Sequence, residues 1–292
     1  MRKINYTVPP EYDGRKVLHF LRGGAGCSYT LVRSLKVFED GILLNGVRTR
    51  TIDHVHAGDT VTITLHDHPK DAQQCDTLVE VLYEDEDIIV YNKPPAMACH
   101  QAKQHQQGTL ANVFAQHCAQ QGTALTCRIL NRMDRDTSGA VLIAKNAFAA
   151  AALTGQVHKL YLAIVSGAPD PADGMIDAPI GQPDRCDPRR AVMEGGQRAL
   201  TEYRTVASCT NYSAVYCTLP TGRTHQIRVH MSHAGCPLLG DALYGGEQDL
   251  IQRQALHCME VSFSHPVSGE KMTITATVPQ DMQKLLEQCP KS

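Results

Sequence analysis

Apolar and polar positions follow two different periods in the first part of the chain. Apolar residues recur at helical spacing over residues 17–22 and 28–38, and Ser28 stands where an N-cap is expected. The dipeptide Asn45-Gly46 between apolar residues indicates a hairpin, and residues 58–65 alternate with the period of a strand. The pattern predicts a small α/β module over residues 1–68, with two helices and a small sheet.

A polar segment at residues 69–77 follows neither period and is predicted to be a linker. Beyond it, short strands flank an acidic turn at residues 84–87, and helices are expected near residues 109–120 and 147–154. The apolar run from Gly139 to Ala144 is typical of a buried strand. Strands and helices mix without a regular alternation, which predicts an α+β domain with a largely antiparallel sheet over residues 78–292.

Composition narrows the class of protein. No stretch of the 292 residues approaches the roughly 18 apolar residues of a membrane span, and the first residues lack the apolar core of a secretory signal, so a cytoplasmic location is expected. The eleven cysteines are odd in number and never spaced as CxxC, which argues against a disulfide framework and a thiolate zinc site. The net charge of −2 means that any contact with nucleic acid must depend on local basic patches.

The stretch NRMDRDTSGAVLIAKN (residues 131–146) carries the first candidate for chemistry. Asp136 has a simple explanation as a turn residue, but Asp134 has none. Asp134 lies between Arg132 and Arg135, whose guanidinium groups favour an ionised carboxylate if they fold back toward it. Such a carboxylate beside a core strand is a candidate nucleophile or base; a structural ion pair at the start of the strand is the alternative.

The second candidate is TGRTHQIRVHMSHAGCPLLGDALYG (residues 221–245). Its pattern predicts a short helix capped by Thr224, with Arg223 just outside the N-terminus, where an arginine can bind a carboxylate or a phosphate. A surface arginine is the alternative. His230, His233 and Cys236 share a spacing of three but lack a fourth ligand, so no metal site is predicted.

Taken together, these stretches resemble the pseudouridine synthase family that modifies ribosomal large-subunit RNA and transfer RNA. That family carries His-Arg-Leu-Asp before Thr-Ser-Gly, where this chain has Asn131 and Met133 in place of His and Leu. It also carries Gly-Arg-(Thr/Ser)-His-Gln-(Ile/Leu)-Arg-Val-His and a Pro-x-Leu-Gly-Asp-x-x-Tyr-Gly tail, which run unbroken over residues 222–245. The likeness spans about residues 78–280, and residues 14–65 more weakly resemble the RNA-binding module named after the fourth small-subunit ribosomal protein.

The resemblance implies a mixed catalytic domain around a bifurcated antiparallel sheet and an isomerisation that needs no cofactor. By residue-to-residue match, Asp134 attacks the target uridine, and Arg223 lowers the pKa of that carboxyl against the effect of burial. Tyr161 stacks on the uracil and is a candidate to assist removal of the C5 proton. Arg132 occupies the space that the extruded uridine leaves.

Structured RNA is the expected partner, ribosomal RNA first and transfer RNA second, with no membrane and no obligate protein partner. The residues expected to contact RNA are Arg33, Lys36, Arg132, Arg135, Arg185, Arg189, Arg190 and Arg228. Two rival classes stay open. A non-catalytic RNA-binding protein would not need Asp134, Tyr161 and Arg223 together, and a glycoside hydrolase would need a second carboxyl group and aromatic sugar platforms.

Overall fold

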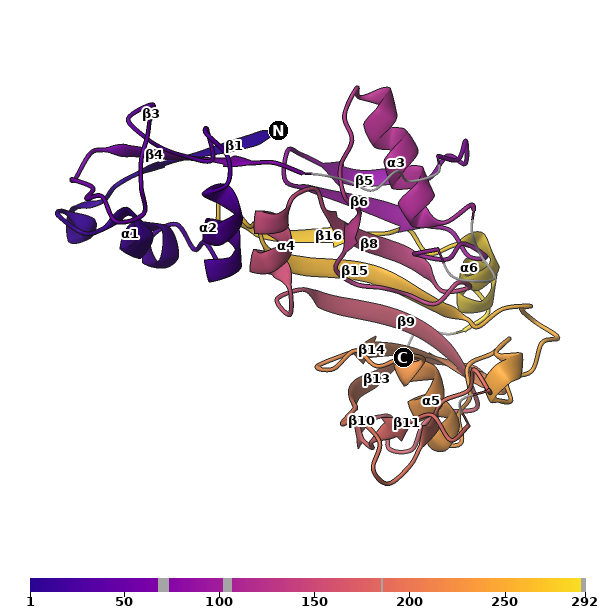
Figure 1. Ribbon diagram of the computed structural model, residues 1–292. Helices are drawn as coiled ribbons and strands as arrows, with labels where there is room; N and C mark the ends of the chain where they lie inside the picture. Colours follow the sequence, from indigo (N-terminus) through magenta and orange to yellow (C-terminus); the bar gives the residue numbers. More distant parts are fainter. Residues whose placement is uncertain (68–73, 102–106, 185, 290–292) are drawn as a thin grey trace.

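A computed structural model describes residues 1–67, 74–101, 107–184 and 186–289 and contains two bodies side by side (Figure 1). The first, the amino-terminal body (residues 1–67), has a four-stranded antiparallel sheet in the order β1-β4-β2-β3 with two helices packed beside it. Its elements are β1 (Arg2–Thr7), the 3-10 helix η1 (Pro10–Tyr12), α1 (Val17–Gly23), α2 (Tyr29–Leu35), β2 (Ile42–Leu44), β3 (Val47–Arg48) and β4 (Thr60–Leu65).

Local sequence signals account for most of this body. The Ser28 side chain accepts a hydrogen bond from the backbone amide of Leu31 at 3.1 Å, which confirms the predicted N-cap of α2. Asn45 and Gly46 have positive φ angles of 51° and 83°, as the tight turn of the β2–β3 hairpin requires. Strand β1, which pairs with β4, was not predicted.

The larger body is built on a ten-stranded sheet whose main path runs β10-β13-β14-β9-β15-β8-β6-β5. Strand β16 branches off β15 and β7 branches off β8. Among the described strands of this sheet, β15 and β8 form the one parallel pair, so the sheet is mixed but largely antiparallel, as predicted. Its strands are β5 (Val81–Glu84), β6 (Ile88–Lys93), β7 (Arg128–Ile129), β8 (Ser138–Ala144), β9 (His158–Ser166), β10 (Asp173–Asp177), β13 (Leu200–Ser208), β14 (Tyr212–Thr218), β15 (Leu256–Ser264) and β16 (Lys271–Thr275).

Helices and a small hairpin surround this sheet (Figure 1). They are α3 (Leu110–Gln120), α4 (Ala147–Leu153), α5 (Gln226–His233), η2 (Ala242–Tyr244), α6 (Gln280–Leu286) and the pair β11 (Ile180–Gly181) and β12 (Ala191–Val192). In the part of the chain that is described, no helix combines the length and the apolar character needed to cross a bilayer.

The contact between β8 and β15 depends on one glycine. Gly139 has a φ of 118°, and a Cβ atom built on it would lie 2.2 Å from the carbonyl oxygen of Cys258. A side chain at this position would therefore collide with the backbone of the neighbouring strand. Gly139 lies five residues after Asp134. The close approach of β8 to β15 therefore also fixes the position at which the segment that carries Asp134 joins the sheet.

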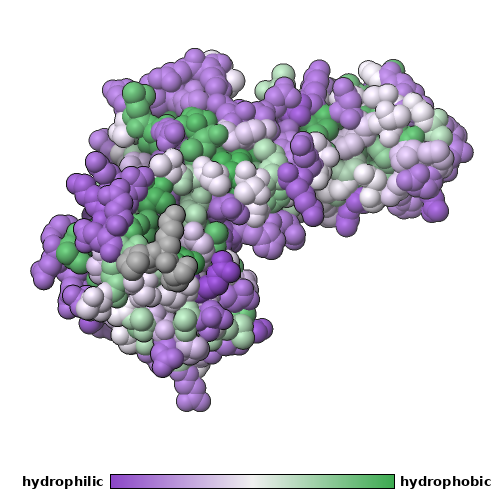
Figure 2. Space-filling view, turned by 180° about the vertical axis from the view of Figure 1, so that it is seen from behind, coloured by the Kyte–Doolittle hydropathy of each residue, from purple (hydrophilic) through white to green (hydrophobic). Residues whose placement is uncertain are grey.

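The amino-terminal body projects to one side of the larger body (Figures 1 and 2). Three ion pairs between described residues join them: Arg2 donates to both carboxylate oxygens of Asp87 at 3.1 and 2.9 Å and pairs with Glu86 at 2.8 Å, and Arg128 donates to both oxygens of Asp67 at 2.9 Å. Phe148 of α4 is buried in the apolar cluster of the amino-terminal body. The predicted linker, residues 69–77, lies in large part outside the described residues.

Candidate active site

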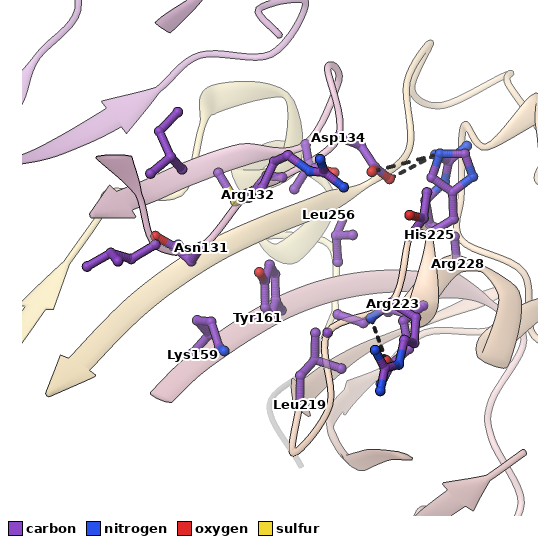
Figure 3. Close-up of a pocket in the computed structure, with 18 of the residues that line it drawn as sticks. Asn131, Arg132, Asp134, Lys159, Tyr161, Leu219, Arg223, His225, Arg228 and Leu256 are labelled. Carbon is purple, nitrogen blue, oxygen red and sulfur yellow. Dashed lines mark hydrogen bonds and ion pairs between the residues drawn. The ribbon is translucent and has the colours of Figure 1, made fainter. Parts of the chain in front are cut away.

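A cavity of about 420 Å³ opens beside the segment that leads into β8, next to β9 and the start of α5 (Figure 3). Its volume falls in the range of roughly 300–1,000 Å³ that is usual for small-ligand sites. Asp134, Tyr161, Arg223 and Arg132, predicted from distant stretches of sequence, all line it. Among the described lining residues, Asp134 is the sole carboxylate.

The guanidinium beside Asp134 belongs to Arg228. Arg228 Nη1 donates to Asp134 Oδ2 at 2.9 Å, while the Nε and Nη2 atoms of Arg228 donate to the two oxygens of Asp241 at 2.6 and 2.8 Å. The side chains of Arg228 and Asp241 are 7% and 1% exposed, and that of Asp134 is 24% exposed. The buried carboxylate therefore orients a guanidinium whose remaining nitrogen, Nη1, binds Asp134 at the cavity, and these ion pairs raise the pKa of Arg228 against the lowering effect of burial.

The prediction that Arg223 is the partner of Asp134 is thus wrong. Arg223 is exposed, and its Nε donates to the backbone carbonyl of Arg198 at 3.0 Å. The side chain of Arg228, which was predicted to contact RNA, is buried between two carboxylates at the wall of the cavity, and its contact with RNA stays a prediction.

The start of α5 explains why Arg228, and not Arg223, is the partner of Asp134. The N-cap is His225, in a left-handed conformation with φ of 58°, and not the predicted Thr224. The Gln226 side chain accepts the backbone N–H of Arg223 at 2.9 Å, so the turn before the helix is stabilised by a residue inside it. Arg228 lies within the first turns of α5 and faces the cavity, whereas Arg223 precedes the helix and faces solvent.

Tyr161 stands on β9, in register with Cys258 of β15, and is 6% exposed. Figure 3 shows its ring between Lys159 and Leu256, below the segment that carries Arg132 and Asp134. Burial raises the pKa of Tyr161 well above its ordinary value, so its phenol stays protonated near neutral pH. Lys159 also lines the cavity, and burial lowers its pKa.

A buried lysine supports the Asp134 segment from below. Lys93 Nζ donates to the backbone carbonyls of Pro94, Met97 and Arg135, at 2.9, 2.7 and 2.9 Å. Burial lowers the pKa of Lys93 to about 8. The lysine that ends β6 thus ties its own loop to the turn after Asp134, a role that its place before two prolines did not reveal.

Asn131 has a structural place. Its side-chain amide donates to the carbonyl of Ala140 and accepts the N–H of Leu142, both at 2.8 Å, and it is 5% exposed. Its side chain therefore pairs with the backbone of β8. Its neighbour Arg132 is exposed, and in Figure 3 its guanidinium extends across the cavity toward Asp134.

The remaining arginines predicted to contact RNA differ in their surroundings. Arg135 pairs with Asp136 and Arg189 pairs with Asp187, both at the surface. Arg190 is half-buried, and its backbone N–H donates to Tyr244 Oη at 2.9 Å.

The last three residues predicted to contact RNA are Arg33, Lys36 and Arg185. Arg33 and Lys36 are exposed on and after α2, and neither forms an ion pair with a described carboxylate. Arg185 lies outside the described residues.

The histidine spacing in α5 has a structural explanation. His230 is buried, and its two ring nitrogens bond to Thr201 Oγ1 and the carbonyl of Ala178, both at 2.9 Å. Neither nitrogen is then free for a metal. Among the described residues, Asp85, Asp87 and His265 lie close enough together to share an ion, but Arg2 already occupies Asp87.

Three residues of the site received no role from sequence, namely Lys93, Asp241 and Tyr244. Tyr244 Oη lies 2.8 Å from His225 Nδ1, and the Tyr244 ring lies 4.9 Å from the Arg228 guanidinium carbon. Asp241 and Tyr244 both belong to the Pro-x-Leu-Gly-Asp-x-x-Tyr-Gly tail. This motif was the signal in the sequence that could have identified them. The motif alone did not indicate that Asp241 and Tyr244 both contact Arg228.

The chain is similar to known proteins of one family. Residues 87–233 match the family described as RNA pseudouridylate synthase. The chain is 37% identical over 276 residues to an uncharacterized RNA pseudouridine synthase, YjbO, of Bacillus subtilis (strain 168), covering 91% of this chain and 96% of the relative. It is also 37% identical over 269 residues to the ribosomal large subunit pseudouridine synthase D of Xanthomonas campestris pv. campestris, covering 84% and 80% of the two chains.

Among solved structures, human RNA pseudouridylate synthase domain containing 4 shares the fold, with a TM-score of 0.59, 23% identity, and coverage of 71% of this chain and 92% of the human one. The chain belongs to the RNA pseudouridylate synthase family, as the resemblance of its motifs predicted. It is accordingly an isomerase, an enzyme that makes pseudouridine from uridine in RNA.

Proposed function

We propose that this enzyme isomerises uridine in structured ribosomal RNA, with Asp134 as the nucleophile. Relatives named ribosomal large subunit pseudouridine synthase D support the ribosomal substrate, with transfer RNA as the second candidate. The observation that carries the nucleophile is the asymmetric environment of one carboxylate. Asp134 Oδ2 accepts a hydrogen bond from Arg228, whereas Oδ1 accepts none from a described residue.

The chemistry follows from that asymmetry. A guanidinium on one oxygen keeps the carboxylate ionised in a partly dry site and leaves the other oxygen with its lone pairs available. Asp134 Oδ1 attacks C1′ of the ribose and forms an ester bond, while the bond between C1′ and N1 breaks and the uracil leaves as an anion, which turns to present C5. C5 then attacks C1′, so that the carbon–carbon bond forms as the ester bond breaks and the carboxylate is regenerated. The C5 proton is lost, and N1 gains one proton in its place. Atoms balance without an added group, so no cofactor is needed.

The target uridine has to leave its helix to reach this carboxylate. A base inside a stack is inaccessible, and enzymes that act on bases swing them into a pocket. The cavity is large enough for one nucleoside, and Tyr161 offers a buried aromatic ring on its wall. Arg132, exposed at the same cavity, is suited to fill the space left in the RNA.

A carboxylate-based glycoside hydrolase would also attack an anomeric carbon. Such an enzyme needs a second carboxyl group as general acid, within roughly 5 to 10 Å of the first. The described residues lining this cavity include one carboxylate only. The single-carboxylate site supports an intramolecular transfer instead of hydrolysis.

The test is to incubate the purified enzyme with unmodified ribosomal RNA and, in parallel, transfer RNA, and to map pseudouridine at single-nucleotide resolution. We expect product in ribosomal RNA and none with Asp134→Asn. Product in transfer RNA alone would overturn the substrate, and an active Asp134→Asn enzyme would overturn the nucleophile.

A further inference from the structure

We propose that His225 is a positioning residue that donates its Nε2–H to Asp134 Oδ1, and that Tyr244 dictates this tautomer of the imidazole. The inference rests on the proposed role of Asp134 and adds the group that controls how its free oxygen is presented. It concerns the side chains of Asp134, His225 and Tyr244 and the backbone amide of Arg190, which lies in the β11–β12 hairpin.

The tautomer follows from counting hydrogens. The backbone N–H of Arg190 lies 2.9 Å from Tyr244 Oη, and a backbone amide can only donate, so the phenol oxygen accepts there. The phenol hydrogen is then available for the contact of 2.8 Å between Tyr244 Oη and His225 Nδ1. With Nδ1 as the acceptor in that contact, the imidazole hydrogen resides on Nε2, and this is the tautomer that we infer.

Nε2 is the ring atom that faces the carboxylate. It lies 3.8 Å from Asp134 Oδ1, while Arg228 binds Oδ2. One hydrogen bond leaves the carboxylate free to turn about its Cβ–Cγ bond, and a second donor on the other oxygen restricts that rotation. The gap of less than 1 Å to a normal hydrogen bond of about 3 Å can close when a nucleoside enters the cavity.

The surroundings keep the ring in this place. Tyr244 contacts both groups that flank Asp134, because its ring stands edge-on to His225 with centroids 5.7 Å apart and lies 4.9 Å from the Arg228 guanidinium carbon. His225 also adopts a left-handed backbone conformation, φ of 58°, which is uncommon for a residue other than glycine. Burial lowers the pKa of His225, which keeps the imidazole neutral.

The experiment compares His225→Gln with His225→Asn. The amide nitrogen of glutamine reaches the position of Nε2, whereas that of asparagine reaches only the position of Nδ1. We expect Gln to retain single-turnover release of the C5 hydrogen within about 10-fold of wild type and Asn to lose about 100-fold, as for a hydrogen bond to a charged group. Affinity for RNA should change less than about twofold in both variants, because the effect is on orientation.

If His225 had a structural role alone, the Asn variant would be more active than the Gln variant, because asparagine adopts the left-handed conformation more readily than glutamine. An Asn variant as active as Gln, or more active, overturns the proposal. His233→Gln, at the exposed end of the same helix, serves as the matched control and should remain fully active. Tyr244→Phe keeps the ring against Arg228 and removes the hydroxyl alone, and we expect it to lose about 10-fold.

Two further readouts separate the possible failures. Nitrogen-15 NMR of wild-type enzyme should show a protonated Nε2 and an unprotonated Nδ1 in His225; the reverse assignment overturns the proposal even if the variants do not fold. If Asp134→Asn makes pseudouridine, the proposed nucleophile fails. If Asp134→Asn is inactive and Gln, Asn and Ala at position 225 are equally impaired, the positioning role alone fails.

Discussion

Arg228 bonds to Asp134 with one nitrogen and to Asp241 with two others, so a single guanidinium joins a half-buried carboxylate to a fully buried one. A lysine cannot reproduce this arrangement, because an ammonium is a point charge without the planar fork. We expect Arg228→Lys to lower turnover by about 100-fold or more, by releasing Asp134 from a fixed orientation.

Removal of the guanidinium altogether should also destabilise the protein, since it leaves the Asp241 carboxylate without its charged partner in the interior. For Arg228→Met we expect a loss of about 3–5 kcal/mol in the free energy of unfolding, measured by urea denaturation. Arg50→Met is the control: Arg50 pairs with Asp53 in a largely exposed ion pair, and its change should cost far less stability. Equal losses at the two sites would contradict the special status of the buried pair.

Tyr161 presents a test of stacking against proton transfer. Because burial keeps its phenol protonated near neutral pH, the hydroxyl is a poor base, and the ring is the more useful part of the side chain. Tyr161→Phe should therefore retain turnover within about 10-fold, whereas Tyr161→Leu should lose about 100-fold or more, as expected when an aromatic partner of the base is removed. The measurement is single-turnover formation of pseudouridine, and a Phe variant as inactive as Leu would indicate that the hydroxyl does the chemistry.

Much of the fold could be predicted because its signals are local. The Ser28 cap and the Asn45-Gly46 turn are read from a few adjacent residues, and each has the conformation that its chemistry requires. Strand β1 was missed for the opposite reason. Only Ile4 is buried in it, and its partner is β4, where Arg2 lies opposite Leu65, so nothing nearby in the sequence marks it as a strand.

The candidate site could also be predicted only in part, because its contacts depend on residues far apart in the sequence. Motifs predicted that Asp134 and an arginine of the Gly222 segment would meet, but not which arginine, since the answer depends on where α5 begins. That start is set by a left-handed His225, a conformation that propensity does not favour. The chain enters the helix after Arg223 and turns Arg228 inward, and only the folded backbone shows this.

Gly139 offers a prediction about the sheet itself. In Gly139→Ala the new Cβ would collide with the Cys258 backbone, and the residue would also have to keep a φ of 118°. We expect a loss of more than about 3 kcal/mol in the free energy of unfolding, together with reduced activity, because the strand that follows Asp134 must move. Gly155→Ala is the control that separates the collision from the backbone strain. Gly155 also has a positive φ, 77°, but open space around it, so this substitution should cost about 1 kcal/mol.

The Asp67–Arg128 pair between the two bodies predicts a pH dependence. Burial alone would raise the pKa of Asp67, but hydrogen bonds from Arg128 and Thr126 outweigh it and lower that pKa to about 2. A carboxyl whose pKa is depressed by folding adds stability above its unfolded pKa and loses it as pH falls toward the folded value. Asp67→Asn should thus cost about 2 kcal/mol at pH 7.

That difference should shrink as the pH is lowered from about 5 toward 2, as urea unfolding of both proteins would reveal. Asp53→Asn is the control for a carboxylate that pairs within the amino-terminal body alone, in the largely exposed contact with Arg50. It should cost much less stability at pH 7 than Asp67→Asn. A constant difference between wild type and Asp67→Asn across this range would show that the pair does not respond to protonation.

Arg33 and Lys36 test whether the amino-terminal body contacts RNA. Both are exposed, and neither pairs with a described carboxylate, so their charges are available to phosphates. Each phosphate contact contributes about 0.7–0.9 to the slope of log affinity against log salt concentration. We expect the double change Arg33→Gln/Lys36→Gln to weaken binding of ribosomal RNA and to reduce that slope by about 1.5.

The matched control removes the same charge from arginines that already have partners. Arg48 pairs with Glu39 and Arg50 with Asp53, so Arg48→Gln/Arg50→Gln should alter the slope by less than about half as much. Turnover at saturating RNA should be unchanged by Arg33→Gln/Lys36→Gln, because a contact made equally in the ground state and the transition state affects KM alone. An unchanged slope would mean that the amino-terminal body does not bind the substrate through these two residues, and a fall in turnover would mean that they act on the chemical step.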